Sequence, residues 1–165
     1  FPFLPGQQAL IGAQASLMYL PALLERLLGH DFFTARPPKS AGREQFNLNW
    51  LEQFLQGDES AADIQATLLE LTARGVVDAA NRWCAGYSAL HVCGGGVHNT
   101  TLMQRLQQLA GKPALSTTTI GLDPDWLEAI AFAWLAHRCL NNLPGNLPAV
   151  TGARGLRVLG AIYPA

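Results

Sequence analysis

The sequence predicts an α/β fold in which parallel strands are flanked by helices. Two observations support this prediction. Segments with the apolar spacing of helices alternate with short apolar runs typical of strands, the order expected for strand–helix–strand units. The two short runs, residues 88–93 and 114–117, are separated by one helical segment. Such a segment is the crossover that a parallel pair of strands requires.

The first half of the chain contains three predicted helices. Residues 19–28, YLPALLERLL, place leucines on one side and end at Gly29. Residues 47–55 give a second, shorter helix. Residues 61–86 predict a long helix with Asp63 in its first turn, where the helix dipole favours an anion.

The second half supplies the strands. Residues 88–93 and 114–117 predict strands, and residues 100–109 predict the helix between them. Residues 123–140 predict a helix that begins with a capping aspartate followed by proline at its first position. This helix is apolar nearly all round and is therefore expected to be buried. We expect it to pack against the sheet, as does the helix at 61–86.

Two or three strands are too few to cover this much apolar helix. The rest of the sheet is therefore expected from sequence outside the chain, or from strands within residues 10–17. The chain begins at Phe1, and we interpret this start as a cut in a longer protein. This chain should therefore carry an apolar patch that a partner subunit covers, or should be only marginally stable.

Composition excludes several classes of function. The 165 residues carry 11 Lys and Arg against 12 Asp and Glu, for a net charge of −1. No basic stripe is present, so nucleic acid is not an expected partner. The apolar start is interrupted by proline, glycine and glutamine, which argues against a membrane span. Three cysteines, an odd number, suit free thiols in a reducing cytoplasm.

The stretch HVCGGGVHNTTLM, residues 91–103, contains the most informative motif. A strand that ends in glycines and turns at once into a helix offers unpaired backbone N–H groups to phosphates and nucleotides. Gly94, Gly95 and Gly96 leave the backbone bare for a flat or anionic ligand, and Asn99 can cap the helix that follows. The spacing matches neither a Walker A motif nor the dinucleotide fingerprint. From the residues alone, nucleotide binding and a merely tight strand–helix turn both remain open.

Several phrases resemble one family. VCGGGVHNTTLMQRL is similar to the adenosine motif of the sugar kinase, actin and Hsp70 superfamily. Four more phrases resemble, in order and spacing, the carboxy-terminal half of anhydro-N-acetylmuramic acid kinases: PPKSAGREQFN, ADIQATLLELTA, LEAIAFAWLAHR and NLPGNLPAVTGA…VLGAIYP. The resemblance covers residues 19–165. Ala41 departs from it, because the family usually has a hydroxyl residue there, and residues 1–18 match no family phrase.

The resemblance implies a ribonuclease H-like lobe of the actin and sugar-kinase type, incomplete in this chain, that binds ATP. Gly94, Gly95, Gly96, Val97, His98 and Asn99 would contact the nucleotide. The family uses ATP to phosphorylate the 6-oxygen of 1,6-anhydro-N-acetylmuramic acid while water opens the anhydro ring, a step in cell-wall recycling. Its aspartate base and its glycine-rich phosphate loop, which works with magnesium, precede the matched region. This chain would therefore hold no catalytic base and no metal site, and would need the amino-terminal lobe and a homodimer partner.

Other candidate residues have ordinary structural explanations beside functional ones. Lys39, Ser40 and Arg43 form a cationic loop that could face substrate or phosphate, or could be a structural loop paired through Glu44. Glu128 could be a functional carboxylate, or one satisfied by a neighbouring arginine or backbone group.

The sequence gives less support to a metal site or to an acid–base pair than to a nucleotide site. His91, Cys93 and His98 lack the paired spacing of metal ligands. Asp123 and Asp125 resemble an acid–base pair, but the start of a helix explains both.

Three functions are compatible with the sequence. The leading hypothesis is the carboxy-terminal lobe of an anhydro-sugar kinase. A related sugar kinase with another substrate is the second, and a non-catalytic nucleotide-binding or dimerisation module is the third. A phosphate loop and an aspartate upstream in the reading frame would support a kinase.

Overall fold

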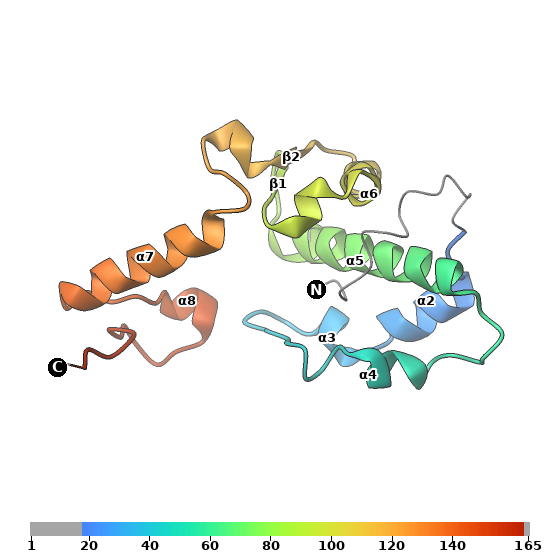
Figure 1. Ribbon diagram of the computed structural model, residues 1–165, viewed down its shortest axis with the longest axis horizontal. Helices are drawn as coiled ribbons and strands as arrows, with labels where there is room; N and C mark the ends of the chain where they lie inside the picture. The colour runs from blue at the N-terminus through green and yellow to red at the C-terminus, as the bar shows by residue number, and fades with distance from the viewer. Residues whose placement is uncertain (1–17, 164–165) are drawn as a thin grey trace.

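The computed structural model describes residues 18–163 and has the helix and strand order of an α/β protein (Figure 1). Its elements are α2 (Pro21–Leu28), α3 (Asp31–Thr34), α4 (Leu48–Glu52), α5 (Ala61–Trp83), β1 (Leu90–Val92), η1 (Gly95–His98), α6 (Thr100–Ala110), β2 (Ala114–Ser116), η2 (Thr117–Ile120), α7 (Leu127–Leu140) and α8 (Pro148–Thr151). None of the helices in this described part is long and apolar enough to cross a membrane. Residues 10–17, for which the sequence allows further strands, lie outside the described residues.

Helix α5 is the central element of the fold. Ser60 caps its start, since the Ser60 hydroxyl accepts a hydrogen bond from the Asp63 backbone N–H at 3.1 Å. One face packs on α2 through a core of buried leucines: Leu23, Leu24, Leu27, Leu51 and Leu71. The buried Thr67 hydroxyl accepts a hydrogen bond from the Leu20 backbone N–H at 2.9 Å, which fixes the start of α2 on this face.

A glycine inside α5 allows an aromatic side chain to approach closely. A Cβ atom built on Gly75 would lie only 3.2 Å from the Phe33 ring. The Phe33 ring also packs edge-on against Phe32 and at a tilt against Phe46, and this cluster anchors α3 beneath α5. A mid-helix glycine costs about 0.5–1 kcal/mol relative to alanine, and this contact is its structural reason.

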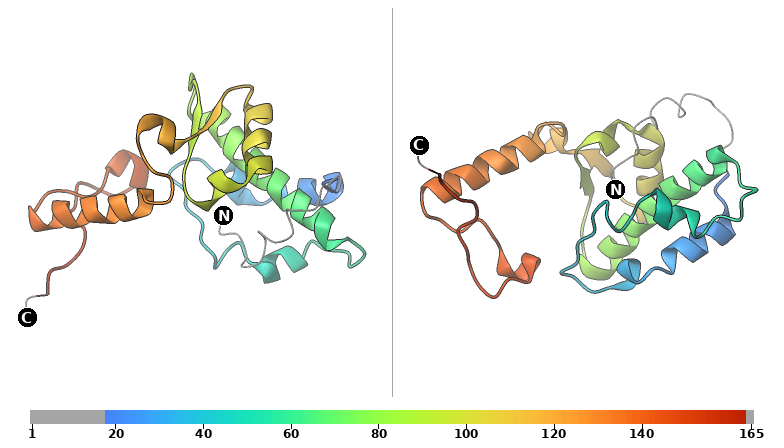
Figure 2. Two further views of the ribbon diagram at one scale, coloured as in Figure 1. Left: turned by 45° about the horizontal axis from the view of Figure 1, so that its top comes forward. Right: turned by 60° about the horizontal axis from the view of Figure 1, so that its bottom comes forward.

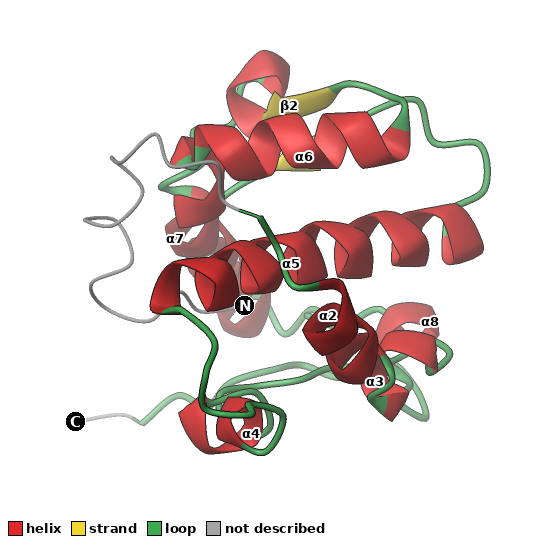
Figure 3. Ribbon diagram, turned by 90° about the vertical axis from the view of Figure 1, so that its right-hand side faces the viewer, coloured by secondary structure: helices red, strands yellow, loops and turns green. Residues whose placement is uncertain are grey.

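The opposite side of α5 meets α6 and the sheet, and Figure 3 shows α6 running along α5 with β2 behind it. Four side chains form this second core: Ala73, Val77, Leu102 and Leu106. Leu90, Val92 and Ala114 of the strands pack against it. The prediction that the long helix packs against the sheet is therefore confirmed.

The strands β1 and β2 are parallel, as predicted, with Leu90 paired to Ala114 and Val92 to Ser116. Helix α6 is the crossover between them. Its ends follow from sequence, because the Asn99 side chain caps the first turn and Gly111 adopts the left-handed conformation at the last. The described residues form a sheet of two strands only.

Helix α7 contradicts the prediction that residues 123–140 are buried against the sheet. Trp126 is 64% exposed, Ile130 46% and Trp134 50%. In both views of Figure 2, α7 projects away from the body formed by α5, α6 and the strands. The core over the strands is already formed by α5 and α6, which pack together with Leu90, Val92 and Ala114, and α7 contributes no residue to it.

The start of α7 also differs from the prediction. Asp123 and Pro124 precede a turn, and the helix itself begins at Leu127. The Asp123 carboxylate accepts the Asp125 backbone N–H at 2.9 Å, so it caps this turn rather than the helix. Beyond α7 the chain folds back along it, where Arg138 donates from Nε to the Pro144 carbonyl at 2.7 Å.

Candidate functional site

The three glycines lie at the carboxyl end of β1. Gly94 has φ +69°, a conformation that side chains rarely adopt, and it turns the chain out of the strand. Gly95 opens the short helix η1, which delivers the chain to Asn99. We call residues 94–98 the glycine turn. Its predicted place, between a parallel strand and the helix that crosses over, is confirmed.

The glycine turn offers free donors beside open space. A Cβ atom built on Gly94 or Gly95 would meet nothing within 4 Å. Gly95 and Gly96 are the first residues of η1, so neither N–H has an acceptor within that helix. Within residues 18–163 no other acceptor engages these two groups. Bare backbone with unpaired N–H groups at the end of a strand suits an anionic or flat ligand.

The last residue of the motif, Asn99, has its side chain engaged in the fold. Its Oδ1 accepts the Leu102 backbone N–H at 3.0 Å, the capping contact that the sequence predicted. Val97 is half-buried, and its N–H donates to the Gly94 carbonyl at 3.1 Å. These contacts shape the turn, and they do not involve the N–H groups of Gly95 and Gly96.

A second segment, residues 123–125, lies against the glycine turn. The Gly94 N–H donates to the Pro124 carbonyl at 2.9 Å, and His98 Nε2 lies 2.8 Å from Asp125 Oδ1. The segment therefore contacts both ends of the turn. From the sequence, the start of a helix explains Asp125, and no local pattern indicates its pairing with His98.

The neighbouring strand contributes hydroxyl groups to the same edge. Thr117 to Thr119 follow β2 directly, and the Thr119 hydroxyl lies 3.4 Å from His91 Nδ1 on β1. Thr119 also donates to the Ser116 carbonyl at 2.8 Å. The carboxyl edge of the sheet thus combines bare backbone, hydroxyls, a histidine and a carboxylate, all groups that hydrogen-bond a nucleotide.

The cationic loop of Lys39, Ser40 and Arg43 is only partly free. The Lys39 ammonium donates to the Phe32 carbonyl at 2.6 Å and lies 4.6 Å from the centre of the Phe32 ring. This contact holds the loop on α3. The alternative of an ion pair through Glu44 is wrong, because the described residues contain no such pair. Ser40 and Arg43 are exposed.

Other candidates acquire no role from the structure. Glu128 is exposed in the first turn of α7. Cys84, Cys93 and Cys139 are free thiols. In residues 18–163, no three histidine, cysteine or carboxylate side chains gather as metal ligands.

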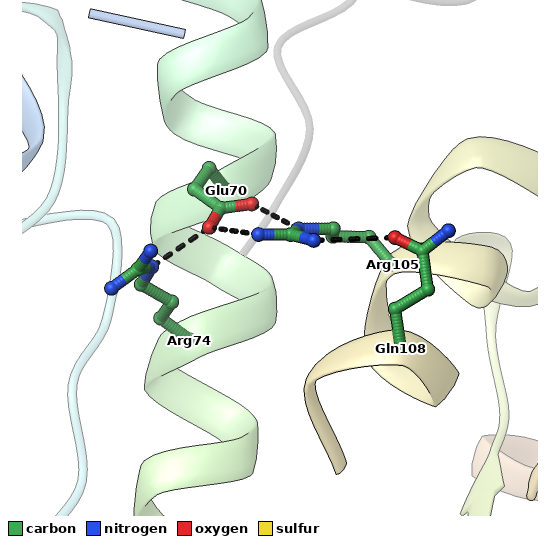
Figure 4. A network of polar contacts seen from close by, with 4 residues as sticks. All are labelled: Glu70, Arg74, Arg105 and Gln108. Carbon is green, nitrogen blue, oxygen red and sulfur yellow. Dashed lines mark hydrogen bonds and ion pairs between the residues drawn. The ribbon is translucent and has the colours of Figure 1, made fainter. Parts of the chain in front are cut away.

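An ion-pair network holds the helix that follows the glycine turn (Figure 4). Glu70 on α5 is 2% exposed, and its carboxylate receives both Nε and a terminal nitrogen of Arg105 on α6. Arg74 Nε donates to the same carboxylate at 2.7 Å. Hydrogen bonds from Arg105, more than those from Arg74, hold the pKa of Glu70 below its ordinary value. No local sequence pattern indicates the pair between Glu70 and Arg105, since these residues lie 35 apart in the chain.

The family model for anhydro-N-acetylmuramic acid kinase matches residues 11–165. The chain is 52% identical over 147 residues to the anhydro-N-acetylmuramic acid kinase of Nitrosospira multiformis, covering 88% of this chain and 40% of the relative. It is 53% identical over 154 residues to that of Pseudomonas putida, covering 92% of this chain and 42% of the relative. The chain thus spans about two fifths of the length of these relatives.

Proposed function

The chain belongs to the anhydro-N-acetylmuramic acid kinase family, and from that premise we propose that it forms the adenosine-binding lobe of an ATP-dependent sugar kinase. Residues 19–165 would make up this lobe, and residues 1–18 form an amino-terminal segment to which we assign no role. ATP would be contacted by Gly94, Gly95, Gly96, Val97, His98 and Asn99.

The glycine turn is the observation that carries the proposal. Its two unpaired N–H groups and the open space beside Gly94 and Gly95 leave room for a ribose or an adenine ring. A ligand at the carboxyl edge of a parallel sheet also fits the general rule for open α/β folds. The Ser116–Thr119 hydroxyls on the adjacent strand end would complete the polar side of the site.

The proposed reaction transfers the γ-phosphoryl group of ATP to the 6-oxygen of 1,6-anhydro-N-acetylmuramic acid. Water opens the anhydro bridge in the same reaction, giving N-acetylmuramic acid 6-phosphate. Phosphoryl transfer depends almost entirely on positioning and charge stabilisation. This chain would contribute the positioning of the nucleotide, while the base that activates water and the loop that binds the phosphates would come from elsewhere in the protein. Lys39, Ser40 and Arg43 remain candidates for a contact with phosphate or sugar.

Magnesium would neutralise charge on the phosphates of ATP. Among residues 18–163, no three histidine, cysteine or carboxylate side chains gather where they could hold the ion. We propose that the groups that hold the ion lie mainly outside this chain.

We further propose that the lobe is ribonuclease H-like and acts in the cytoplasm as part of a homodimer. The exposed apolar side chains of α7 support a need for more protein around this chain. We assign that cover to the amino-terminal part of the same polypeptide, since the relatives are about two and a half times as long as the matched region. Size-exclusion chromatography with light scattering would test the dimer.

The activity is tested with the full-length protein, ATP, magnesium and the anhydro-sugar, followed by phosphorus NMR. We expect a sugar 6-phosphate signal and ADP. The isolated 165-residue chain should give neither. Failure of the full-length protein with this sugar but success with another would favour a related sugar kinase. Nucleotide binding without turnover of any sugar would favour a non-catalytic module.

A further inference from the structure

The contact between His98 and Asp125 joins two segments that the chain separates by 27 residues. His98 ends the glycine turn, and Asp125 lies in the turn before α7. Both side chains are exposed, 55% for His98 and 57% for Asp125. The pair therefore contributes little to burial of the core, and its place beside the candidate site calls for another explanation.

Two contacts at opposite ends hold the glycine turn. At its start, the Gly94 N–H is bonded to the Pro124 carbonyl; at its end, the His98 ring is bonded to the Asp125 carboxylate. Gly95 and Gly96, whose N–H groups are unpaired, lie between these contacts. Glycine has the greatest backbone freedom of any residue, so a run of three needs external contacts to keep its donors in one direction.

Asp125 also has a fixed position of its own. Its backbone N–H donates to the Asp123 carboxylate at 2.9 Å, which orders the turn that carries it. The carboxylate of Asp125 is then the one side-chain anion that the described residues place on the glycine turn. Its bond to Nε2 leaves Nδ1 of His98 as the ring atom available to a ligand.

We infer that Asp125 is a positioning residue for nucleotide binding: it orients the His98 ring and, with the Pro124 carbonyl, holds the glycine turn in its binding conformation. The inference rests on the proposed function. It assigns Asp125 an effect on affinity for the nucleotide, transmitted through His98, and no direct part in phosphoryl transfer.

The test is a double-mutant cycle in the full-length protein. The Kd of adenylyl imidodiphosphate, a non-hydrolysable ATP analogue, is measured by calorimetry for the unaltered protein, Asp125→Ala, His98→Ala and the double variant. Loss of one hydrogen bond should raise Kd about two- to tenfold in Asp125→Ala. Because Asp125 acts through His98, its removal should have no further effect in the His98→Ala background. Circular dichroism verifies that each variant is folded.

Two variants separate positioning from a general structural effect. Asp125→Asn keeps an oxygen acceptor for His98 and should restore Kd to within about twofold of the unaltered protein. Asp58→Ala removes an exposed carboxylate from the loop before α5 and should leave Kd unchanged. In turnover assays, Asp125→Ala should raise KM for ATP and leave kcat at saturation near its original value.

The outcomes distinguish this inference from the function on which it rests. If the unaltered protein binds no adenylyl imidodiphosphate, the proposed function and the inference both fail. If it binds but Asp125→Ala has no effect, or if the effects of the two substitutions add in full, the inference alone is overturned.

Discussion

Glu70 and Arg105 join α5 to α6 through two hydrogen bonds on one buried carboxylate (Figure 4). Helix α6 begins directly after the glycine turn, so this contact also fixes the turn relative to the main helix. Arg105 is the better partner for Glu70, because its planar guanidinium matches a carboxylate with two donors. Arg74 supplies a single bond from the same helix as Glu70.

Replacing Arg105 should destabilise the protein more than replacing Arg74. Arg105→Ala leaves a buried carboxylate with one partner, and we expect a loss of roughly 1.5–3 kcal/mol in the free energy of unfolding. Arg74→Ala should cost less, since the Arg74 side chain is 37% exposed and the pair lies within one helix. Urea denaturation measures both values. Equal losses of unfolding free energy would show that the contact between α5 and α6 stabilises the protein no more than the pair within α5.

The Glu70 network should make stability depend on pH in the acidic range. Arg105 lowers the pKa of Glu70 in the folded protein below its ordinary value of 4.5. A lowered folded pKa gives a contribution that is present above about pH 4.5 and is lost as the pH falls through the folded pKa. The difference in unfolding free energy between the unaltered protein and Glu70→Gln should therefore shrink below about pH 4.5. A difference that stayed constant down to the acid transition would contradict this assignment.

Gly95→Val tests whether the open space at the glycine turn belongs to the ligand. Gly95 has no positive φ and no atom within 4 Å of a built Cβ, so the variant should fold. Its branched side chain would occupy the ligand's space and should weaken binding of the ATP analogue at least about tenfold. Calorimetry with a thermal melt of the same sample separates affinity from folding. Unchanged affinity in a folded variant would place the nucleotide elsewhere.

The apolar face of α7 should be exposed in this chain and covered in the full-length protein. Trp134→Ala should then change the stability of the 165-residue chain by no more than about 0.5 kcal/mol. In the full-length protein the same substitution should cost about 3–5 kcal/mol. Leu71→Ala is the matched control. Leu71 lies in the core and is 1% exposed, so its replacement should destabilise the 165-residue chain and the full-length protein alike. Equal effects of Trp134→Ala in the two proteins would mean that α7 stays exposed.

Local patterns were sufficient to predict most elements of the fold. Apolar spacing identified α5 and α6, and the strand–helix–strand order identified a parallel pair, because a crossover of this length permits no other common arrangement. The same patterns failed for α7, since apolar residues all round a helix indicate that it needs cover without indicating which segment supplies it. The capping pattern at Asp123 belongs to a turn that precedes α7, and the helix itself begins at Leu127.

The candidate site was predicted in part. The sequence located the glycine turn and Asn99 as the cap of α6, both consequences of local backbone geometry. Asp125 and Pro124 were missed as neighbours of this turn, because their contacts join segments that follow different strands. One available signal was the parallel pairing itself: segments after adjacent parallel strands emerge at the same edge of the sheet.

The central claim is that the glycine turn binds the adenosine part of ATP. A crystal structure of the full-length protein with adenylyl imidodiphosphate tests it most directly. We predict that the adenine or ribose will contact residues 94–99, with a backbone N–H of Gly95 or Gly96 directed at the ligand. A nucleotide bound more than one helical turn, about 5.4 Å, from these residues would contradict the account.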